Sequence, residues 1–189
     1  MDESSFTPPV IFTERLVLRP FRMSDAEDVF AYASDDEVSR YMTWETHRSI
    51  EDSLGYLRFT LDAYQGGNHY DYAIELAETG HVIGAGGAFR GIEHDGRFAQ
   101  IGYVLHRDYW GRGLMPEAMG AFLRFLFEDK DVHRVEAYHF EPNRKSGRVM
   151  QKIGMAYEGT CQDKYFIKGA YRTVCLYAAI NPNHSEVSP

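Results

Sequence analysis

The sequence predicts a mixed α/β fold in which a six- to seven-stranded mixed sheet carries about four helices on its faces. Three observations predict it: strand-like and helix-like periodicities alternate along the chain, a strand followed by a helix occurs twice in the second half, and two hairpin patterns flank these units. A strand–helix–strand unit implies a parallel crossover, so the central strands should run parallel. No repeat, low-complexity tract or linker interrupts the pattern, which predicts one domain over residues 1–189, with a core of about 11–180 and frayed ends.

The first predicted elements are a strand and two helices. Residues 16–19 form a strand that Pro20 ends, and Ser24 with Glu27 gives the Ser-x-x-Glu capping box of a helix running to about residue 33. A second helix follows Ser49 and stops at residues 66–67, which are both glycine. Its apolar residues recur at steps of four and three, which predicts one buried stripe made of Ile50, Leu54, Leu57, Leu61 and Tyr64.

The rest of the chain alternates strands with helices. Residues 78–80 carry turn chemistry, Asn143 is a good helix N-cap after Pro142, and Gly154 is a good helix stop. The helix over residues 114–127 should bury one face, made of Met115, Ala118, Met119, Phe122 and Leu126. The predicted elements are, in order, strands 72–76, 82–89 and 98–105, a helix over 114–127, a strand over 134–140, a helix over 143–154, and a hairpin of strands 157–167 and 171–180.

Composition and charge exclude several classes of protein. A chain of 189 residues with 44% hydrophobic residues can fill a substantial core, yet its longest apolar runs are far shorter than the roughly 20 residues that span a bilayer. Residues 1–5 lack a basic, apolar signal sequence, so we expect a cytoplasmic protein. The net charge of −8 disfavours nucleic acid and anionic membranes as partners. It is compatible with a cationic substrate, although such charge also simply keeps a surface solvated.

Cysteine and histidine spacing gives no sign of a disulfide or a metal site. Cys161 and Cys175 fall in the two strands of the last hairpin, which turns at residues 168–169, and strict alternation puts them on opposite sheet faces. Neither follows an activating helix start, which disfavours a catalytic thiol. The eight histidines form no His-Glu-x-x-His or His-x-His spacing, so we expect no metal.

A glycine-rich loop carries the most chemical information. Gly111 and Gly113 lie between the strand over 98–105 and the helix over 114–127. Glycines let the backbone bend closely around an anion, and a helix N-terminus presents unpaired N–H groups and the positive end of a dipole. Arg112 adds a charge that can bond to phosphate. Gly-x-Gly before a helix is also the form of many ordinary turns, but a second strand and an Asn-x-x-Ser helix start follow about thirty residues later, which favours a slot for a diphosphate.

Several ordered motifs carry a resemblance to a known family. Residues 109–118 (YWGRGLMPEA) resemble the coenzyme A signature of the GNAT N-acetyltransferases. Residues 13–20 (TERLVLRP), 143–146 (NRKS) and 152–155 (KIGM) resemble the RimJ/RimL-type subgroup, which acetylates the N-termini of ribosomal proteins. The resemblance covers about residues 11–180 and agrees with the predicted order of elements.

The resemblance implies acetyl-CoA as the cofactor and direct acetyl transfer to a primary amine. Pantetheine would pair with a splayed strand, the diphosphate would sit on the glycine loop, and an N–H near Leu105 would polarise the thioester carbonyl. Asn143 and Ser146 are the implied catalytic residues, with Ser146 protonating the departing sulfur, whereas without the resemblance they are an N-cap and a first-turn residue. The implied cofactor-binding residues are Tyr103, Val104, Leu105, Trp110, Gly111, Arg112, Gly113, Leu114, Met115, Pro116, Asn143 and Ser146.

The acceptor side departs from the family pattern. Gln100 and Tyr165 stand where many members carry a carboxylate, so the base that deprotonates the amine is open: Asp163, Glu158 and His139 are alternatives, with ordered water as the default proton carrier. By resemblance the acceptor wall comes from the segment between the first two helices and from the last hairpin. Its aromatic residues line a pocket or belong to the core. The implied substrate-binding residues are Tyr41, Trp44, Gln100 and Tyr165, with Met42 beside them.

Two functions of different classes follow. The first is an acetyl-CoA-dependent N-acetyltransferase acting on a protein N-terminus or a small-molecule amine. An α-amine or a tuned small amine is mildly favoured, because the unperturbed α-amine pKa of about 7.7–8.0 makes deprotonation easier than for a lysine near 10.4. The second is a catalytically silent acyl-CoA-binding module that kept the loop but lost the chemistry. A homodimer is expected by resemblance alone.

Overall fold

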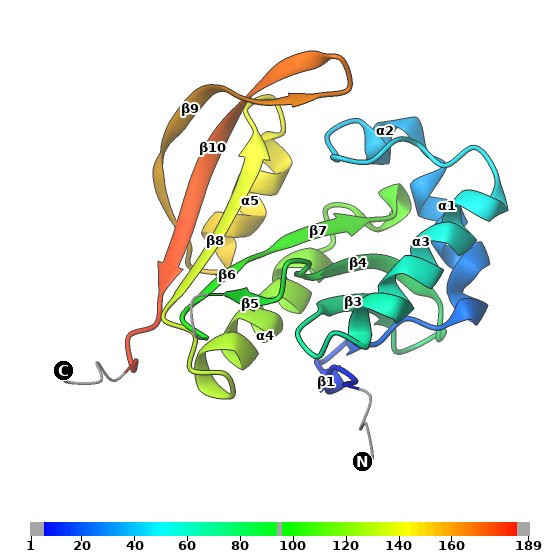
Figure 1. Cartoon of the computed structure of the whole chain (residues 1–189), viewed down its shortest axis with the longest axis horizontal. Helices are drawn as coiled ribbons and strands as arrows, with labels where there is room; N and C mark the ends of the chain where they lie inside the picture. The colour runs from blue at the N-terminus through cyan, green and yellow to red at the C-terminus, as the bar shows by residue number, and fades with distance from the viewer. Residues whose placement is uncertain (1–5, 94–95, 185–189) are drawn as a thin grey trace.

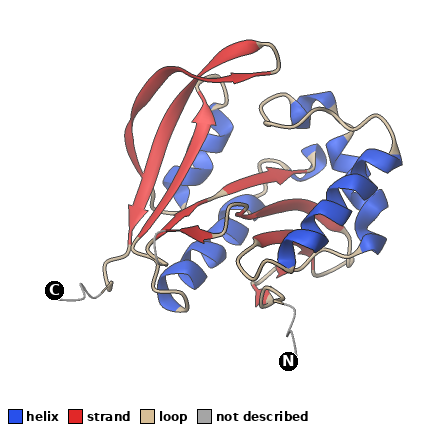
Figure 2. Cartoon of the chain, in the orientation of Figure 1, coloured by secondary structure: helices blue, strands red, loops and turns tan. Residues whose placement is uncertain are grey.

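The computed structural model describes residues 6–93 and 96–184 and shows a mixed α/β fold, as predicted. In that part of the chain the strands form two five-stranded sheets rather than one continuous sheet, and the sheets diverge where the chain passes from one to the other at Ile101 (Figures 1 and 2). The divergence, rather than either sheet alone, positions the functional site.

The first sheet is antiparallel throughout. Its strand order is β1-β2-β3-β4-β7, and its members are β1 (Ile11–Phe12), β2 (Leu16–Arg19), β3 (Tyr70–Leu76), β4 (Val82–Ala88) and β7 (Gly102–Leu105). The hairpin of β3 and β4 turns at Gly80, whose φ of 74° lies in the left-handed region that the predicted turn requires.

The second sheet has the order β5-β6-β8-β10-β9 and contains the parallel pair, β6 with β8. Its members are β5 (Ile92–Glu93), β6 (Phe98–Gln100), β8 (Arg134–Phe140), β9 (Ala156–Ile167) and β10 (Ala170–Ile180). The last two strands form the predicted hairpin around residues 168–169. Cys161 lies opposite Val174 and Cys175 opposite Thr160, so the two free thiols occupy opposite faces as alternation predicted.

The sheets part at Ile101, inside the segment predicted as a single strand. Up to Gln100 the chain pairs with β8, and the Ile101 N–H donates to the Glu136 carbonyl at 2.8 Å as the last link. From Gly102 onward the chain pairs with β4 instead. The prediction of one strand over 98–105 is therefore wrong in detail, because this segment supplies one strand to each sheet.

Helices cover both faces of the first sheet (Figure 2). One face carries α1 and α3, which pack on Ala73, Val82 and Ala85, and the other carries α4, which packs on Tyr72 and Ile74. A fifth helix, α5, packs against β8. The helices are α1 (Ala26–Ala33) after a 3-10 turn η1 (Met23–Asp25), α2 (Asp36–Ser39), α3 (Ile50–Tyr64), α4 (Leu114–Glu128) after η2 (Arg107–Tyr109), and α5 (Arg144–Lys152).

Two helix predictions need correction. The Ser24–Glu27 capping box does not form, because Asp25 instead accepts the Arg22 N–H at 2.7 Å and binds the buried Arg19 guanidinium through both oxygens at 2.9 Å. In α3 the buried face is rotated relative to the predicted stripe and includes polar residues. Ser53, Leu57, Thr60 and Tyr64 are buried, Leu54 and Leu61 are partly buried, and Ile50 is exposed. The stripe of α4 is confirmed, since all five of its predicted residues are buried.

Hydrogen bonds anchor the chain beyond residue 180, where the predicted core ends. Asn181 donates its N–H to the His133 carbonyl at 2.8 Å and its side-chain amide to the Phe127 carbonyl at 3.1 Å. His184 lies 3.0 Å from the Asp131 carbonyl. Residues 181–184 are therefore anchored rather than frayed, and the prediction for residues 1–5 and 185–189 lies outside the described residues.

Candidate active site

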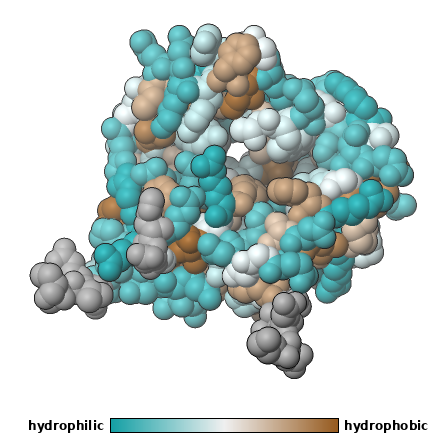
Figure 3. All heavy atoms as spheres, viewed as in Figure 1, coloured by the Kyte–Doolittle hydropathy of each residue, from teal (hydrophilic) through white to brown (hydrophobic). Residues whose placement is uncertain are grey.

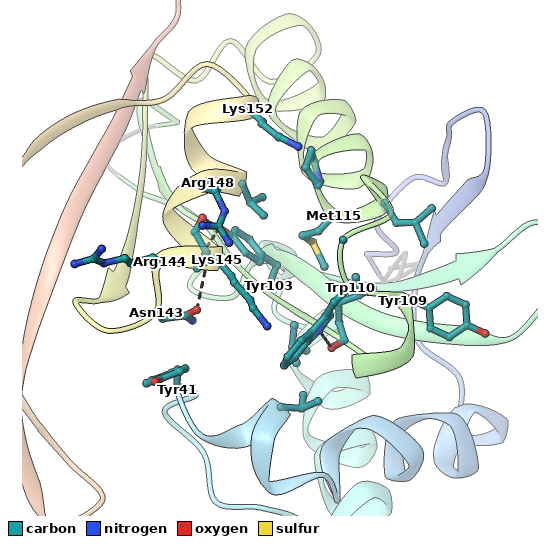
Figure 4. Close-up of a pocket in the computed structure, with 18 of the residues that line it drawn as sticks. Tyr41, Tyr103, Tyr109, Trp110, Met115, Asn143, Arg144, Lys145, Arg148 and Lys152 are labelled. Atoms are coloured by element: carbon teal, nitrogen blue, oxygen red, sulfur yellow. Dashed lines mark hydrogen bonds between the residues drawn. The ribbon is translucent and has the colours of Figure 1, made fainter.

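A cavity of about 600 Å³ opens where β7 and β8 part (Figure 4). The space-filling view shows the molecule hollowed between its two halves (Figure 3). One side, the β7–α4 wall, consists of residues 103–116, and the facing side, the α5 wall, consists of residues 142–152. Glu37, Val38, Tyr41 and Met42, in and after α2, line a third side.

The β7–α4 wall turns backbone groups toward the cavity. His106 donates its N–H to the Ile83 carbonyl at 2.8 Å, in register with the pairing of β4 and β7. Antiparallel pairing alternates, so the N–H and C=O groups of Tyr103 and Leu105 point away from β4, to the side that β8 has left. The Leu105 carbonyl accepts the indole N–H of Trp110 at 2.7 Å. The Leu105 N–H is turned away from β4 by this register, and residues 6–93 and 96–184 offer it no acceptor on the other side.

The loop before α4 supplies further free donors. Gly111 and Gly113 adopt φ values of 77° and 78°, which a side chain would strain. The first loop-to-helix bond runs from the Glu117 N–H to the Gly113 carbonyl at 3.2 Å, and the described part of the chain provides no acceptor for the N–H groups of residues 111–115. A Cβ added at Gly111 would meet no protein atom within 4 Å, so the loop faces open space.

The α5 wall brings Ser146 to the cavity. Asn143 is the N-cap of α5 as predicted, and its Oδ1 accepts the Ser146 N–H at 3.4 Å. The Tyr103 hydroxyl reaches across from β7, donates to the Ser146 carbonyl at 2.9 Å, and lies 2.9 Å from Ser146 Oγ. Burial raises the pKa of Tyr103 well above its ordinary value, despite the opposing effect of this hydrogen bond, so the phenol stays protonated.

The α5 wall is also cationic. Arg144, Lys145, Arg148 and Lys152 all line the cavity, and Figure 4 shows the Arg144 guanidinium directed outward, away from the other three side chains. No carboxylate in the described residues forms an ion pair with any of the four. Lys145 Nζ instead lies 4.4 Å from the centre of the Trp110 ring, so a cation–π contact bridges the two walls.

Comparison with known proteins decides the family. The profile described as "Acetyltransferase (GNAT) domain" matches residues 15–156, which is most of the chain. The chain belongs to the GNAT acetyltransferase family.

Relatives extend this assignment. The uncharacterized N-acetyltransferase YoaA of Bacillus subtilis (strain 168) is 30% identical over 92% of this chain and 98% of its own length. The [ribosomal protein uS5]-alanine N-acetyltransferase of Escherichia coli (strain K12) is 24% identical over 90% of each chain. The crystal structure of a GNAT acetyltransferase from Bacillus anthracis superposes with a TM-score of 0.81 at 26% identity, covering 92% of this chain and 99% of that one.

This GNAT protein is therefore an N-acetyltransferase that transfers the acetyl group of acetyl-CoA to a primary amine, as the sequence predicted. The cavity fits the donor, because a diphosphate needs several convergent N–H groups, and residues 111–115 offer theirs without a protein acceptor in the described chain. Nothing in the comparisons supports the silent acyl-CoA-binding alternative. Among residues 6–93 and 96–184, no helix combines the length and apolar character needed to cross a bilayer.

Most of the predicted site residues line one cavity. Four of them lie elsewhere. Arg112 turns its guanidinium over the Tyr109 ring at 5.1 Å, Trp44 packs against the core under α1 and α3, Gln100 pairs with β8 inside the second sheet, and Tyr165 packs on Tyr138 at 5.2 Å. Their roles stay predictions. The predicted residues in the lining are Tyr41, Tyr103, Val104, Leu105, Trp110, Gly111, Gly113, Leu114, Met115, Pro116, Asn143 and Ser146, with Met42.

None of the three side chains considered as bases lines the cavity. Glu158 pairs with Arg134 through both oxygens, and this ion pair holds the pKa of Glu158 below its usual range. Asp163 is exposed at a bulge in β9, with φ at 46°. His139 lies behind α5, with Nδ1 2.8 Å from the Phe140 carbonyl.

Sequence reasoning missed two features of the site. Among the described residues that line the cavity, Glu37 of α2 is the one with a carboxylate. The cations of α5 face it across the opening. The α5 segment, RKSGRVMQK, holds four basic residues and no acidic one, which is a signal the sequence does contain. A solvated helix face has the same composition, so the signal gains meaning only once β7 and β8 are seen to part.

Proposed function

We propose that the acetyl donor binds with its pantetheine arm along β7 and its diphosphate on the loop of residues 111–115. The observation that supports this most is the set of backbone donors that point away from the protein: the N–H groups of Tyr103 and Leu105 on β7 and, beyond η2, those of the loop. A strand-like pantetheine arm can pair with the first two as an added strand would. The cationic α5 wall then faces the same ligand from the other side.

Acetyl-CoA supplies the activated acetyl group, and the chain orients and polarises it. The arm runs from the loop past Leu105 to Tyr103, so an amide of the arm pairs with Leu105 and the thioester carbonyl reaches the Tyr103 N–H, which stabilises the negative charge that develops on the thioester oxygen as the amine attacks. The new C–N bond forms as the C–S bond breaks, and Ser146 gives its proton to the departing sulfur. The Tyr103 hydroxyl lies 2.9 Å from both the Ser146 carbonyl and Ser146 Oγ, so its one proton can turn from the carbonyl to Oγ as Ser146 loses its own. The amine releases its proton to water, and water returns one to Ser146, so the reaction is balanced.

We propose the α-amine of a protein or peptide N-terminus as the acceptor. No side chain considered as a base lines the cavity, and an α-amine, with its unperturbed pKa of about 7.7–8.0, is partly neutral near pH 7 without one. Glu37 gives this end of the cavity a negative charge that attracts the ammonium form. The Escherichia coli relative is named for transfer to an N-terminal alanine of a ribosomal protein, which supports the same acceptor class.

A small-molecule amine is the second acceptor class, and one contact favours it. The tip of the β9–β10 hairpin reaches α2, where Lys168 Nζ donates to the Ser39 carbonyl at 2.9 Å (Figure 1). Ser39 lies between the cavity-lining residues Val38 and Tyr41, so this contact narrows the approach for a bulky acceptor.

An acceptor screen tests the proposal. Release of CoA thiol would be measured with peptides that begin with Ser or Ala, with the same peptides blocked at the α-amine, and with polyamines and amino acids. We expect the free peptides to give the highest kcat/KM and the blocked ones to give none. Turnover of small amines alone would overturn the N-terminal assignment. In that case Lys168→Ala, which removes the contact that narrows the approach, should leave small-amine turnover unchanged, because small amines do not need the wider opening.

We also propose that residues 1–189 work as one domain in the cytoplasm, where the free thiols of Cys161 and Cys175 stay reduced. A homodimer stays a prediction.

A further inference from the structure

A turn far from the cavity in sequence is bonded to the start of α4. Residues 13–15 connect β1 to β2, and they converge on the Glu117 carboxylate in the first turn of α4. Glu117 Oε1 accepts from the Thr13 hydroxyl at 2.6 Å and from the Arg15 N–H at 2.8 Å. Glu117 Oε2 accepts from Arg15 Nε at 2.7 Å and lies 2.6 Å from Arg15 Nη2. Both carboxylate oxygens therefore have partners.

Arg15 also touches the glycine loop itself. Its Nη1 donates to the Arg112 carbonyl at 3.1 Å, while a Cβ added at Gly113 would lie 3.6 Å from its Nη2. In a trans peptide the C=O and the following N–H point in opposite directions. A bond that holds the Arg112 carbonyl toward Arg15 therefore turns the Gly113 N–H to the opposite side of that peptide, where the described residues offer it no acceptor.

The Arg15–Glu117 ion pair also offsets a repulsion between like charges. Glu117 lies four residues after Gly113, so an unpaired carboxylate there would repel a diphosphate on the loop. Burial alone would raise the pKa of Glu117, but the bonds from Thr13 and Arg15 and the charge of Arg15 outweigh it and lower the pKa. Glu117 thus stays ionised, and Arg15 cancels its charge within the ion pair.

We propose that Arg15 is a positioning residue for the acetyl donor: it fixes the direction of the Gly113 N–H and neutralises Glu117 beside the diphosphate. This inference rests on the placement of the diphosphate at the 111–115 loop. It assigns a role in cofactor binding to the turn between β1 and β2, which lies outside the cavity lining.

Two substitutions separate the effect of charge on CoA binding from the effect of the lost ion pair on stability. Arg15→Met leaves the Glu117 carboxylate unpaired next to the ligand, whereas Glu117→Gln removes that carboxylate and leaves Arg15 in place. Both variants lose the ion pair, so both should lower the Tm by similar amounts. Affinity should differ: we expect Arg15→Met to weaken CoA binding about tenfold and Glu117→Gln about two- to threefold, with the double variant between them.

Calorimetry with CoA and kinetics with two donors form the test. Acetyl-pantetheine carries the thioester but lacks the diphosphate. In Arg15→Met the KM for acetyl-CoA should rise about tenfold with little change in kcat, and kcat/KM for acetyl-pantetheine should stay within about twofold of wild type. Arg134→Met is the matched control, because Arg134 also forms ion pairs, with Glu136 and Glu158, but lies outside the cavity lining.

The outcomes distinguish the inference from its premise. If the wild-type protein uses acetyl-CoA no better than acetyl-pantetheine, the placement of the diphosphate fails. If it discriminates between them but Arg15→Met weakens both donors equally, or if affinity follows Tm across the variants, Arg15 has only a structural role and the proposal is overturned. Should Arg15→Met not fold, Arg15→Lys keeps the charge but not the forked geometry, and should weaken CoA binding with acetyl-pantetheine unaffected.

Discussion

The two walls of the cavity hold their polar groups in opposite ways. In the β7–α4 wall the polar groups that face the cavity are backbone N–H groups, and the Glu117 carboxylate behind them is paired with Arg15. In the α5 wall the groups that face the cavity are side-chain cations with no carboxylate partner in the described chain. The first wall is fixed before any ligand arrives, and the second carries charge that only a ligand balances.

This difference assigns different tasks to the walls. Fixed amides recognise shape and direction, so a charge placed among them should cause the largest loss of affinity. Flexible cations add long-range attraction that salt screens, so changes there should weaken binding by degrees. Tyr103 and Ser146, which connect the walls, should affect turnover more than binding, because they meet where the sulfur would leave.

The largest effect is expected from a charge placed on the fixed wall. Gly111→Asp would set a carboxylate in the open space that the loop faces. At about 5 Å from a diphosphate and an effective dielectric constant near 20, the repulsion exceeds roughly 3 kcal/mol, so affinity for CoA should fall about a hundredfold or more. Isothermal titration calorimetry measures this directly.

Gly111→Ala is the matched control for that substitution. It imposes the same left-handed strain at φ 77°, at a cost of about 1–2 kcal/mol in stability, without the charge. It should lower the Tm as Gly111→Asp does while keeping most of the affinity. Equal loss of CoA binding in both variants would mean that strain, rather than repulsion, accounts for the effect.

The same contrast explains what the sequence could predict. The glycine loop is local: two glycines, a helix start and a preceding strand stand within about fifteen residues, so its geometry could be inferred. The Arg15–Glu117 contact joins residues 102 apart. In the sequence, residues 13–20 stand out only as a motif, because nothing near Arg15 in the chain indicates a partner on α4.

Two other predictions, one strand over residues 98–105 and the capping box, also failed for physical reasons. The break at Ile101 was not predicted because residues 98–105 keep one strand-like pattern, and only the competition between β4 and β8 for this segment divides it. Likewise Asp25 displaced Ser24–Glu27 as the capping pair because it also neutralises the buried Arg19, a tertiary demand that local capping rules do not include.

A middle-sized effect should come from the residues that join the walls. Ser146→Ala removes the proton donor and should lower kcat about tenfold, with KM for acetyl-CoA nearly unchanged. A tenfold loss is small for general acid catalysis, because a thiolate leaves readily without a proton. Tyr103→Phe should lower kcat about threefold. In Ser146→Ala, adding Tyr103→Phe should cost little more, since the two act as one unit. Tyr171→Phe, on the exposed hairpin tip, should leave kcat unchanged; additive losses at 103 and 146 would show independent roles.

The smallest effects should come from the cations of α5, and they should show which charge of the ligand this wall balances. The diphosphate belongs to the opposite wall, so Arg148 and Lys152 should act on the remaining anion of the donor, its 3′-phosphate. Arg148→Gln and Lys152→Gln should each weaken CoA binding about two- to fivefold at low salt, the size of a solvent-exposed ion pair, and less at 0.5 M salt. Neither should change binding of 3′-dephospho-CoA, whereas Arg58→Gln, an equal change of charge on α3, should affect neither ligand. If both ligands weaken together, the α5 cations attract the diphosphate instead, and the division of tasks between the two walls is incorrect.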